Sequence, residues 1–335
     1  MTALPPLAVT IGDPAGIGPE IILKAWMARE AASLRPFFVT HGAEILEAAA
    51  QACDIDCPVI GIDGPEDARS AYRDGLPVWR RSERQYTPGK PHVSGARLAY
   101  KSLGQAIEYA FHGAASAVVT APVSKSAIAE VDSDFIGQTE LLAQSLRLPL
   151  EHSVMMLAGP TLRTVPMTVH CAIADVPALL TQDLIVERTR IVARALQTDF
   201  GITNPRIAIA GLNPHAGEDG RMGTEEIEVI APAIARLRGE GIDASGPHPA
   251  DTLFAPHKRG TYDVAIAMYH DQALVPLKAL DFDQGVNVTL GLPIVRTSPD
   301  HGTAFDIAGK GIARPDAMIA AIRMAGEIAE RRANG

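Results

Sequence analysis

Short apolar runs, each bounded by proline, glycine or asparagine, recur along the whole chain. Runs of this length that are rich in β-branched residues are typical of buried strands. Longer stretches with a helical apolar period lie between them, and strands that alternate with helices predict a parallel α/β sheet. The predicted strands are 7–11, 37–40, 59–62, 117–120, 163–169, 206–210 and 264–269, and the predicted helices are 21–29, 43–52, 95–112, 141–145 and 184–198.

Three of the predicted strands lead to a histidine. The runs 163–169 and 264–269 end directly before His170 and His270, and the run 206–210 is followed by a short turn and His215. Ligands of parallel α/β sheets bind beyond the carboxyl ends of the strands. One such histidine alone is more often an ordinary loop residue. Three at the same topological place favour a divalent metal site with one coordination position left open.

Length and composition narrow the class of protein. The 335 residues suit two domains or one large α/β unit, and 47% hydrophobic with 21% charged residues is typical of a globular protein. The net charge of −9 argues against nucleic acid or an anionic membrane as a partner, so an anionic substrate needs a locally basic pocket. No apolar stretch is long enough to span a membrane and no targeting signal is visible, which predicts a cytoplasmic protein.

The three cysteines do not form a recognisable metal or disulfide pattern. The spacing of Cys53 and Cys57 does not fit a zinc knuckle, and an odd number gives no disulfide framework. Cys171 follows His170, but neighbours in a strand point to opposite faces, so Cys171 is interpreted as a small buried residue. Any metal is therefore expected to have nitrogen and oxygen ligands.

A glycine-rich turn, 12–20, joins the first strand to the first helix. Proline and glutamate at the start of that helix suit a helix N-terminus, which favours anions. The glycine spacing differs from the dinucleotide fingerprint, so a classical Rossmann site is not indicated. From this motif alone, a ligand-binding turn and a turn that serves only packing remain equally open. The polar stretch 80–93 is predicted to be a loop.

Polar residues that can bind an anion follow other predicted strands. Lys125 near a helix start either binds phosphate or is a solvated surface lysine. Thr139 either contacts a ligand or caps the helix that begins beside it. Lys278 and Arg296, which follow His270 in the chain, provide a point charge and a planar fork for carboxylate or phosphate.

Six segments, taken together, resemble the 4-hydroxythreonine-4-phosphate dehydrogenase family, the NAD-dependent enzymes of the pyridoxal 5′-phosphate pathway. The resemblance covers about residues 7–325, and its Asn-Pro-His and Tyr-His-Asp motifs are the specific ones. The segments are 12–20, 120–125, 211–218, 250–252, 268–272 and 286–291.

A second resemblance, of residues 300–313, is to the adenine-binding loop of isopropylmalate and isocitrate dehydrogenases. It implies two α/β/α domains with a cleft between them and an NAD site that is not a classical Rossmann crevice. Residues 1–125 with 296–335 would form one domain, carrying much of the NAD site. Residues 126–295 would form the other, with the metal ligands and dimer contacts. The family also implies an obligate homodimer with a shared active site.

The resemblance assigns roles residue by residue. His170, His215 and His270 match the three metal ligands, one of them coming from the partner subunit; zinc is the first choice, with magnesium or cobalt as alternatives. Position 138 carries glutamine where the family has histidine, and glutamine cannot carry a proton near neutral pH. The implied substrate-binding residues are Gln138, Thr139, Lys278, Asn287 and Arg296. The implied cofactor contacts, to NAD or alternatively NADP, are Gly12, Asp13, Gly16, Gly18, His301, Gly302, Thr303 and Asp306, although the 300–313 loop can also be a packing turn.

The implied reaction is oxidation of the C3 hydroxyl of 4-phosphohydroxy-L-threonine, a small phosphorylated anion, followed by decarboxylation. Either Lys278 or Asp251 can assist removal of the hydroxyl proton, and the sequence does not choose between them. A paralogous dehydrogenase of a phosphorylated threonate or a carboxylated cyclic dihydrodiol is the nearest alternative. A phosphotransacylase-like enzyme is the alternative from another class.

Overall fold

The chain divides into two compact units in the computed structural model, which describes residues 4–79 and 86–335. The terminal-segment unit comprises Met1–Leu150 and Leu292–Asn334, and the central unit comprises Glu151–Gly291. The resemblance implied divisions at 125/126 and 295/296. Residues 126–150 group instead with the terminal segments, because Ile128 and Leu142 are buried in apolar clusters of that unit.

The terminal-segment unit contains a parallel sheet with the strand order β3-β4-β2-β1-β5-β12. The predicted strands at 7–11, 37–40, 59–62 and 117–120 are all present, with ends within one residue of the prediction. The bounds are β1 (Leu7–Thr10), β2 (Phe37–Thr40), β3 (Val59–Ile62), β4 (Leu76–Trp79), β5 (Val118–Thr120) and β12 (Arg296–Pro299).

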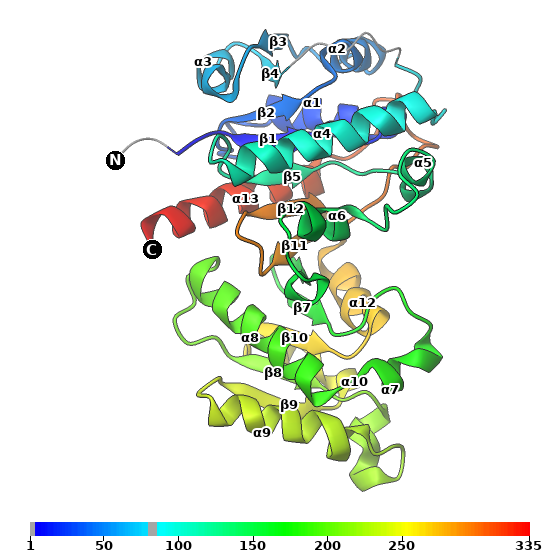
Figure 1. Ribbon diagram of the computed structural model, residues 1–335, viewed down its shortest axis with the longest axis vertical. Helices are drawn as coiled ribbons and strands as arrows, with labels where there is room; N and C mark the ends of the chain where they lie inside the picture. The colour runs from blue at the N-terminus through cyan, green and yellow to red at the C-terminus, as the bar shows by residue number, and fades with distance from the viewer. Residues whose placement is uncertain (1–3, 80–85) are drawn as a thin grey trace. The chain divides into compact units, whose positions relative to one another are not determined.

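Helices cover both faces of this sheet because both faces are apolar. Ala8, Phe38 and Val118 pack in one cluster with residues of α4, which crosses the sheet in Figure 1. The alternate residues Leu7 and Phe37 are also fully buried, on the face that α13 contacts. The helices are α1 (Gly18–Met27), α2 (Ala43–Ala52), α3 (Ala68–Ala71), α4 (Val93–Phe111), α5 (Lys125–Ala129), α6 (Gln138–Ser145) and α13 (Asp316–Asn334).

The central unit contains a mixed sheet with the strand order β11-β6-β7-β10-β8-β9. The prediction of a parallel sheet does not hold for every strand here, because β6 runs antiparallel to both of its neighbours, β7 and β11. The remaining pairs that join β7, β10, β8 and β9 are parallel. The bounds are β6 (Val154–Ala158), β7 (Arg163–Pro166), β8 (Ile207–Ala210), β9 (Ala244–His248), β10 (Val264–Ala267) and β11 (Val286–Leu290).

Apolar side chains that alternate between the two faces of the central sheet again explain why both faces are covered. Ala208 and Ala265 lie in a cluster with Leu277 of α12, whereas Ile207 and Val264, which alternate with them, are buried on the other face. The helices are α7 (Val176–Leu179), α8 (Gln182–Thr198), α9 (Ala231–Gly239), α10 (Ala250–Leu253), α11 (Pro256–Arg259) and α12 (His270–Asp281).

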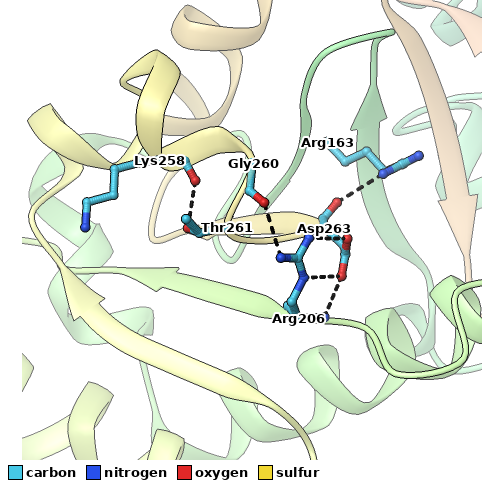
Figure 2. A network of polar contacts seen from close by, with 6 residues as sticks. All are labelled: Arg163, Arg206, Lys258, Gly260, Thr261 and Asp263. Atoms are coloured by element: carbon cyan, nitrogen blue, oxygen red, sulfur yellow. Dashed lines mark hydrogen bonds and ion pairs between the residues drawn. The ribbon is translucent and has the colours of Figure 1, made fainter.

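A polar network fixes the starts of three central strands (Figure 2). Just before β8, Arg206 donates through Nη2 and Nε to the two carboxylate oxygens of Asp263, at 3.0 and 3.2 Å, and its backbone N–H donates to the same carboxylate at 2.8 Å. Asp263, just before β10, also accepts from Arg163 of β7 through its backbone carbonyl, at 3.2 Å. These bonds align the starts of β7, β8 and β10 at one edge of the sheet. They therefore also help to position the residues that follow the opposite ends of these strands.

Within the described residues, no helix is both long and apolar enough to cross a membrane.

Candidate active site

The ends of β7 and β10 bring His170 and His270 side by side. The two strands are parallel neighbours, and their pairing continues beyond them, because Thr168 N–H and Oγ1 both donate to the Met268 carbonyl, at 3.2 and 2.9 Å. The centroids of the two imidazole rings are 6.0 Å apart, with an interplanar angle of 39°. The predicted convergence of two strand-end histidines is therefore present within one chain.

The segment around His170 turns away earlier than the sequence suggested. The strand ends at Pro166 rather than at residue 169, and His170 has a left-handed backbone with φ of 51°. Because the chain is a turn at this point and not a strand, Cys171 is exposed. The interpretation of Cys171 as a small buried residue is wrong.

His270 is the first residue of α12 and has an acidic neighbour. Its Nδ1 lies 2.7 Å from a carboxylate oxygen of Asp271. A carboxylate at Nδ1 favours the tautomer that leaves Nε2 available for a metal, as is usual for metal-binding histidines. The His270 side chain is 37% exposed, so a ligand can reach it.

Gln272 was not assigned a role from the sequence, but it ties two of the histidine-bearing strand ends together. Its amide oxygen accepts from the Met268 N–H at 2.6 Å, and its Nε2 donates to the Gly211 carbonyl at 2.8 Å. Met268 lies just after β10 and Gly211 just after β8. The sequence signal that could have indicated a role for Gln272 was its position inside the Tyr-His-Asp-Gln motif.

His215 lies on an exposed turn that follows β8. Among the described residues, no group of three or more His, Cys, Asp or Glu side chains is placed to hold a metal ion. Two imidazoles bound to one zinc, at about 2.1 Å from nitrogen to metal, have ring centres about 5–6 Å apart. The pair of His170 and His270 therefore fits two positions of a metal site, and the described part of one chain places no third histidine beside them.

Three further predicted residues of the central unit lie on three different elements. Asp251 is exposed on α10, and Lys278 is half-buried in α12, about two turns after His270. The side-chain oxygen of Asn287, on β11, is buried and has no hydrogen-bond partner among the residues described. A buried acceptor without a partner is costly, so this atom is suited to accept from a ligand.

In the terminal-segment unit, Arg296 contacts both the end of β5 and the start of α6. Its Nη2 donates to Thr120 Oγ1 and to the amide oxygen of Gln138, each at 2.7 Å. Burial lowers the pKa of Arg296 to about 10, while the negative charge of Glu140 opposes that shift. The guanidinium therefore remains charged near neutral pH, in a place with little water to compete for it.

Gln138 and Thr139 occupy the first turn of α6. The Gln138 amide nitrogen donates to the Ala121 carbonyl at 3.3 Å, so this side chain links β5 to Arg296. The residue that precedes the helix is Gly137, and no side chain caps the helix there. The alternative of Thr139 as a simple helix cap is therefore not supported.

The glycines of the 12–20 turn are required by close packing within the protein. A Cβ on Gly12 would lie 2.6 Å from the Pro122 carbonyl oxygen, and Gly12 has φ of 71°. A Cβ on Gly16 would lie 2.8 Å from the carbonyl oxygen of Thr303, which also accepts from the Ile17 N–H at 2.9 Å. The turn and the 300–313 loop are thus in direct contact. Gly18 is restricted in the same way, by Ile11.

Asp13 is almost completely buried, and burial raises the pKa of its carboxyl group. It lines a small hollow of about 20 Å³, together with Thr87, Lys90 and His92. These three residues lie in the stretch predicted as a loop, of which 80–85 fall outside the described residues. The hollow was not foreseen; the Pro-Gly-Lys-Pro-His sequence just before α4 was the only signal for it.

The loop after β12 has features of a ligand site. The Nε2 of His301 is buried and has no hydrogen-bond partner in the part of the chain that is described. A Cβ on Gly302 would meet no atom within 4 Å, so the space beside this exposed residue is open. Asp306 is exposed further along the same loop.

Comparisons with known proteins agree over nearly the whole length. A protein named 4-hydroxythreonine-4-phosphate dehydrogenase from Erythrobacter litoralis is 61% identical over 329 residues, which cover 98% of each chain. A protein of the same name from Zymomonas mobilis is 50% identical, over 98% of this chain and 96% of its own. A crystal structure of 4-hydroxythreonine-4-phosphate dehydrogenase from Klebsiella pneumoniae superposes with a TM-score of 0.84 at 37% identity, covering 97% of this chain and 99% of that one.

More distant structures share the fold. A terephthalate 1,2-cis-dihydrodiol dehydrogenase from Burkholderia xenovorans superposes with a TM-score of 0.65 at 28% identity, over 97% of this chain and 98% of that one. A branched-chain phosphotransacylase from Enterococcus faecalis, at 14% identity and a TM-score of 0.53, with 96% and 98% covered, shows the mixed α/β fold alone. The family model described as pyridoxal phosphate biosynthetic protein PdxA matches residues 32–325. The chain therefore belongs to the PdxA family of pyridoxal phosphate biosynthetic proteins.

Proposed function

We propose that this protein is an NAD-dependent dehydrogenase of 4-phosphohydroxy-L-threonine, acting in pyridoxal 5′-phosphate biosynthesis. The observation that carries the proposal is the 61% identity, over 98% of both chains, with a relative that bears the name of this activity. The strand-end histidines and the buried Arg296 supply chemistry that suits it. A cytoplasmic location is part of the proposal.

The proposed reaction has two steps, an oxidation and then the loss of carbon dioxide. The C3–H bond breaks with its electron pair going to NAD⁺, and the C3 hydroxyl gives its proton to a base, so that 2-amino-3-oxo-4-phosphooxybutanoate, NADH and a proton form. The C1–C2 bond of this β-keto acid then breaks, carbon dioxide leaves, and C2 takes up a proton to give 3-amino-2-oxopropyl phosphate.

The terminal-segment unit provides a group of residues suited to the phosphate. Arg296 is charged and buried, so its attraction for an anion is screened less than that of a surface arginine. Thr139 and the N–H groups at the start of α6 add donors next to it. Lys125 lies near the same place, because its Nζ is 3.5 Å from where a Cβ on Gly137 would be.

The central unit provides polar groups suited to the amino-acid part of the substrate. Asn287 has a buried oxygen that can accept from an ammonium group. Lys278 and Asp251 remain the two candidates for holding the proton that leaves the C3 hydroxyl. Lys278 is half-buried and Asp251 is exposed, so Lys278 is the better shielded of the two.

The three histidines are proposed to hold one divalent ion, zinc in the first place and magnesium or cobalt as alternatives. His170 and His270 of one chain have the right separation for two ligands, and His215 would come from a second copy of the chain. When bound, the ion supplies Lewis-acid polarisation of the C3 hydroxyl.

A homodimer is proposed because the described residues of one chain do not bring three metal ligands together. The segments that follow the three histidines also expose large apolar side chains, which is typical of a surface that a partner covers. These side chains are Ile173, Leu179, Met222, Ile227, Val275, Leu280 and Phe282.

NAD, or alternatively NADP, is proposed to bind at the 300–313 loop, with His301, Gly302, Thr303 and Asp306 as contacts. The buried Nε2 of His301 and the open space beside Gly302 support this placement. Asp13 belongs to the 12–20 turn, which contacts this loop through the bond from the Ile17 N–H to the Thr303 carbonyl. Gly16 allows this contact with Thr303, whereas Gly12 and Gly18 allow close packing against Pro122 and Ile11 and so shape the turn.

The deciding measurement is NADH formation from 4-phosphohydroxy-L-threonine, with and without a chelator, beside a panel that contains a phosphorylated threonate and a carboxylated cyclic dihydrodiol. We expect chelator-sensitive turnover of the first substrate. A higher kcat/KM for the dihydrodiol than for 4-phosphohydroxy-L-threonine would favour a dihydrodiol dehydrogenase instead. Two observations support that alternative: the likeness to the Burkholderia xenovorans enzyme and the glutamine at position 138.

A further inference from the structure

The turn that carries His215 has an uncommon backbone. Five consecutive residues, His215 to Asp219, have positive φ values of 52°, 54°, 82°, 42° and 57°. Only one of the five, Gly217, is a glycine, and each other residue costs free energy in the left-handed region. Such a turn persists only if surrounding contacts hold it.

A buried carboxylate provides those contacts. Glu226 is 3% exposed, and its Oε1 accepts from the backbone N–H groups of Leu212 and Asn213, at 2.7 and 2.8 Å. Its Oε2 accepts from the Asn213 side-chain amide at 3.0 Å. Glu226 thus binds the chain directly before His215.

The same carboxylate touches the turn after His215 as well. A Cβ on Gly217 would lie 2.7 Å from Glu226 Oε2, and a Cβ on Gly211 would lie 3.0 Å from Oε1. The two glycines therefore let the backbone close around the carboxylate from both sides. Glu226 also begins a π-helical segment, Glu226–Ile230, a form of helix that is rare and frequently found at functional sites.

We infer that Glu226 is a positioning residue for His215: its carboxylate holds the left-handed turn in the form that presents the imidazole to a metal ion. The inference rests on the proposed metal-binding role of His215. Glu226 itself is buried and acts through the backbone of Leu212 and Asn213, as partners of metal ligands commonly act through other residues.

The test uses Glu226→Gln in the full-length protein, with Glu228→Gln as the matched control. Glutamine keeps one oxygen for the two backbone donors, but it places an NH2 group opposite the Asn213 amide. Glu228 belongs to the same π-helical segment, and its side chain is exposed. The probe is Co²⁺ alone, with its Kd from titration and its visible absorption spectrum as a report on coordination.

We expect Glu226→Gln to raise the Kd for Co²⁺ by about 10- to 100-fold and to shift the spectrum, with Glu228→Gln unchanged. Asn213→Ala removes bonds to both Glu226 and Glu225, so it is compared with Glu225→Ala, which removes only the second. Asn213→Ala should raise the Kd by about 3- to 10-fold relative to Glu225→Ala, and this comparison decides the matter if Glu226→Gln does not fold. Wild-type affinity and spectrum in the folded variants would overturn the inference.

His215→Ala distinguishes a failure of the positioning role of Glu226 from a failure of the proposed metal site. If this variant loses Co²⁺ affinity but Glu226→Gln and Asn213→Ala do not, only the positioning role fails. If His215→Ala binds Co²⁺ as the wild type does, the proposed metal site itself is wrong at this residue, and the inference falls with it.

Discussion

The imidazole rings of His170, on the turn after β7, and His270, the first residue of α12 after β10, lie 6.0 Å apart, centre to centre. The pairing of β7 with β10 and the bonds from Thr168 to Met268 hold the two strand ends together within one chain. If one ion binds three histidines, the two from the same chain should then be His170 and His270. This assignment makes the dimer proposal testable by mixing inactive variants.

Hybrid dimers of His215→Ala and His270→Ala should recover activity. One chain of each hybrid still has both His170 and His270, and the other still has His215, so one of the two sites is complete. A fully exchanged mixture contains about half hybrids, which gives about one quarter of wild-type activity by the symmetry of the dimer.

The matched control is a mixture of His170→Ala with His270→Ala. No site in these hybrids has both histidines on the same chain, so activity should stay at the level of the parents. Recovery in the control mixture would show that His170 and His270 reach the metal from different chains.

Changing His170, His215 or His270 singly to alanine should remove the metal and leave the fold in place. His170 and His215 are exposed and His270 is partly exposed, so each change should alter the free energy of unfolding by only about 0.5 kcal/mol. Elemental analysis beside a melting curve checks both parts. Stoichiometric metal in all three variants would rule out the proposed ligand set.

The pairing of His170 with His270 was predictable, because parallel strands deliver their carboxyl ends to one edge of a sheet. The left-handed turn from His215 to Asp219 was not. Only Gly217 in it has an intrinsic preference for positive φ, and the chain just before the turn is bound by Glu226, which follows later in the sequence. The sequence pattern also does not reveal that β6 runs antiparallel, since strand direction depends on the neighbours.

Side-chain contacts between residues that are far apart in the sequence also could not be predicted from the hydrophobic pattern. Gln138 was identified only as a departure from the family histidine. The structure adds that its amide oxygen accepts from Arg296, 158 positions away, and that its amide nitrogen donates to Ala121. A local pattern carries no information about such a pairing, because it depends on how β5, β12 and α6 meet.

Gln138→Glu tests whether Arg296 binds the anionic substrate. A carboxylate beside the guanidinium would neutralise its charge, so the KM for 4-phosphohydroxy-L-threonine should rise by about 10-fold or more, with little change in the KM for NAD. Gln144→Glu is the control, because it adds the same charge to an exposed position of α6. An unchanged substrate KM in Gln138→Glu would remove Arg296 from the phosphate site.

Asp263→Asn should destabilise the protein in a pH-dependent way. Burial alone would raise the pKa of this carboxyl, but the bonds from Arg206 outweigh it and lower the pKa below the ordinary value of 3.8. A carboxyl whose folded pKa is lowered stabilises the protein above its ordinary pKa, and this stability is lost as the pH falls through the folded pKa.

At pH 7 the free energy of unfolding, from urea titration, should therefore fall by about 1–2 kcal/mol in Asp263→Asn, allowing for partial exposure of the pair. The difference from wild type should shrink below about pH 4. Asp56→Asn, at an exposed position, should change little at either pH. An equal loss at pH 7 and pH 3 would mean that the charge of Asp263 is not what stabilises the strand starts.

Gly302→Val tests the placement of NAD at the loop that follows β12. A Cβ at Gly302 meets no protein atom within 4 Å, so the fold should accept valine, whereas a dinucleotide lying against the loop should not. Losing even one hydrogen bond to the cofactor costs about 0.5–1.5 kcal/mol, so the KM for NAD should rise at least about 3- to 10-fold, while that for substrate changes far less. Gly104→Val, at an equally open position on α4, should leave both constants unchanged. A raised substrate KM with an unchanged NAD KM would assign the loop to the substrate instead.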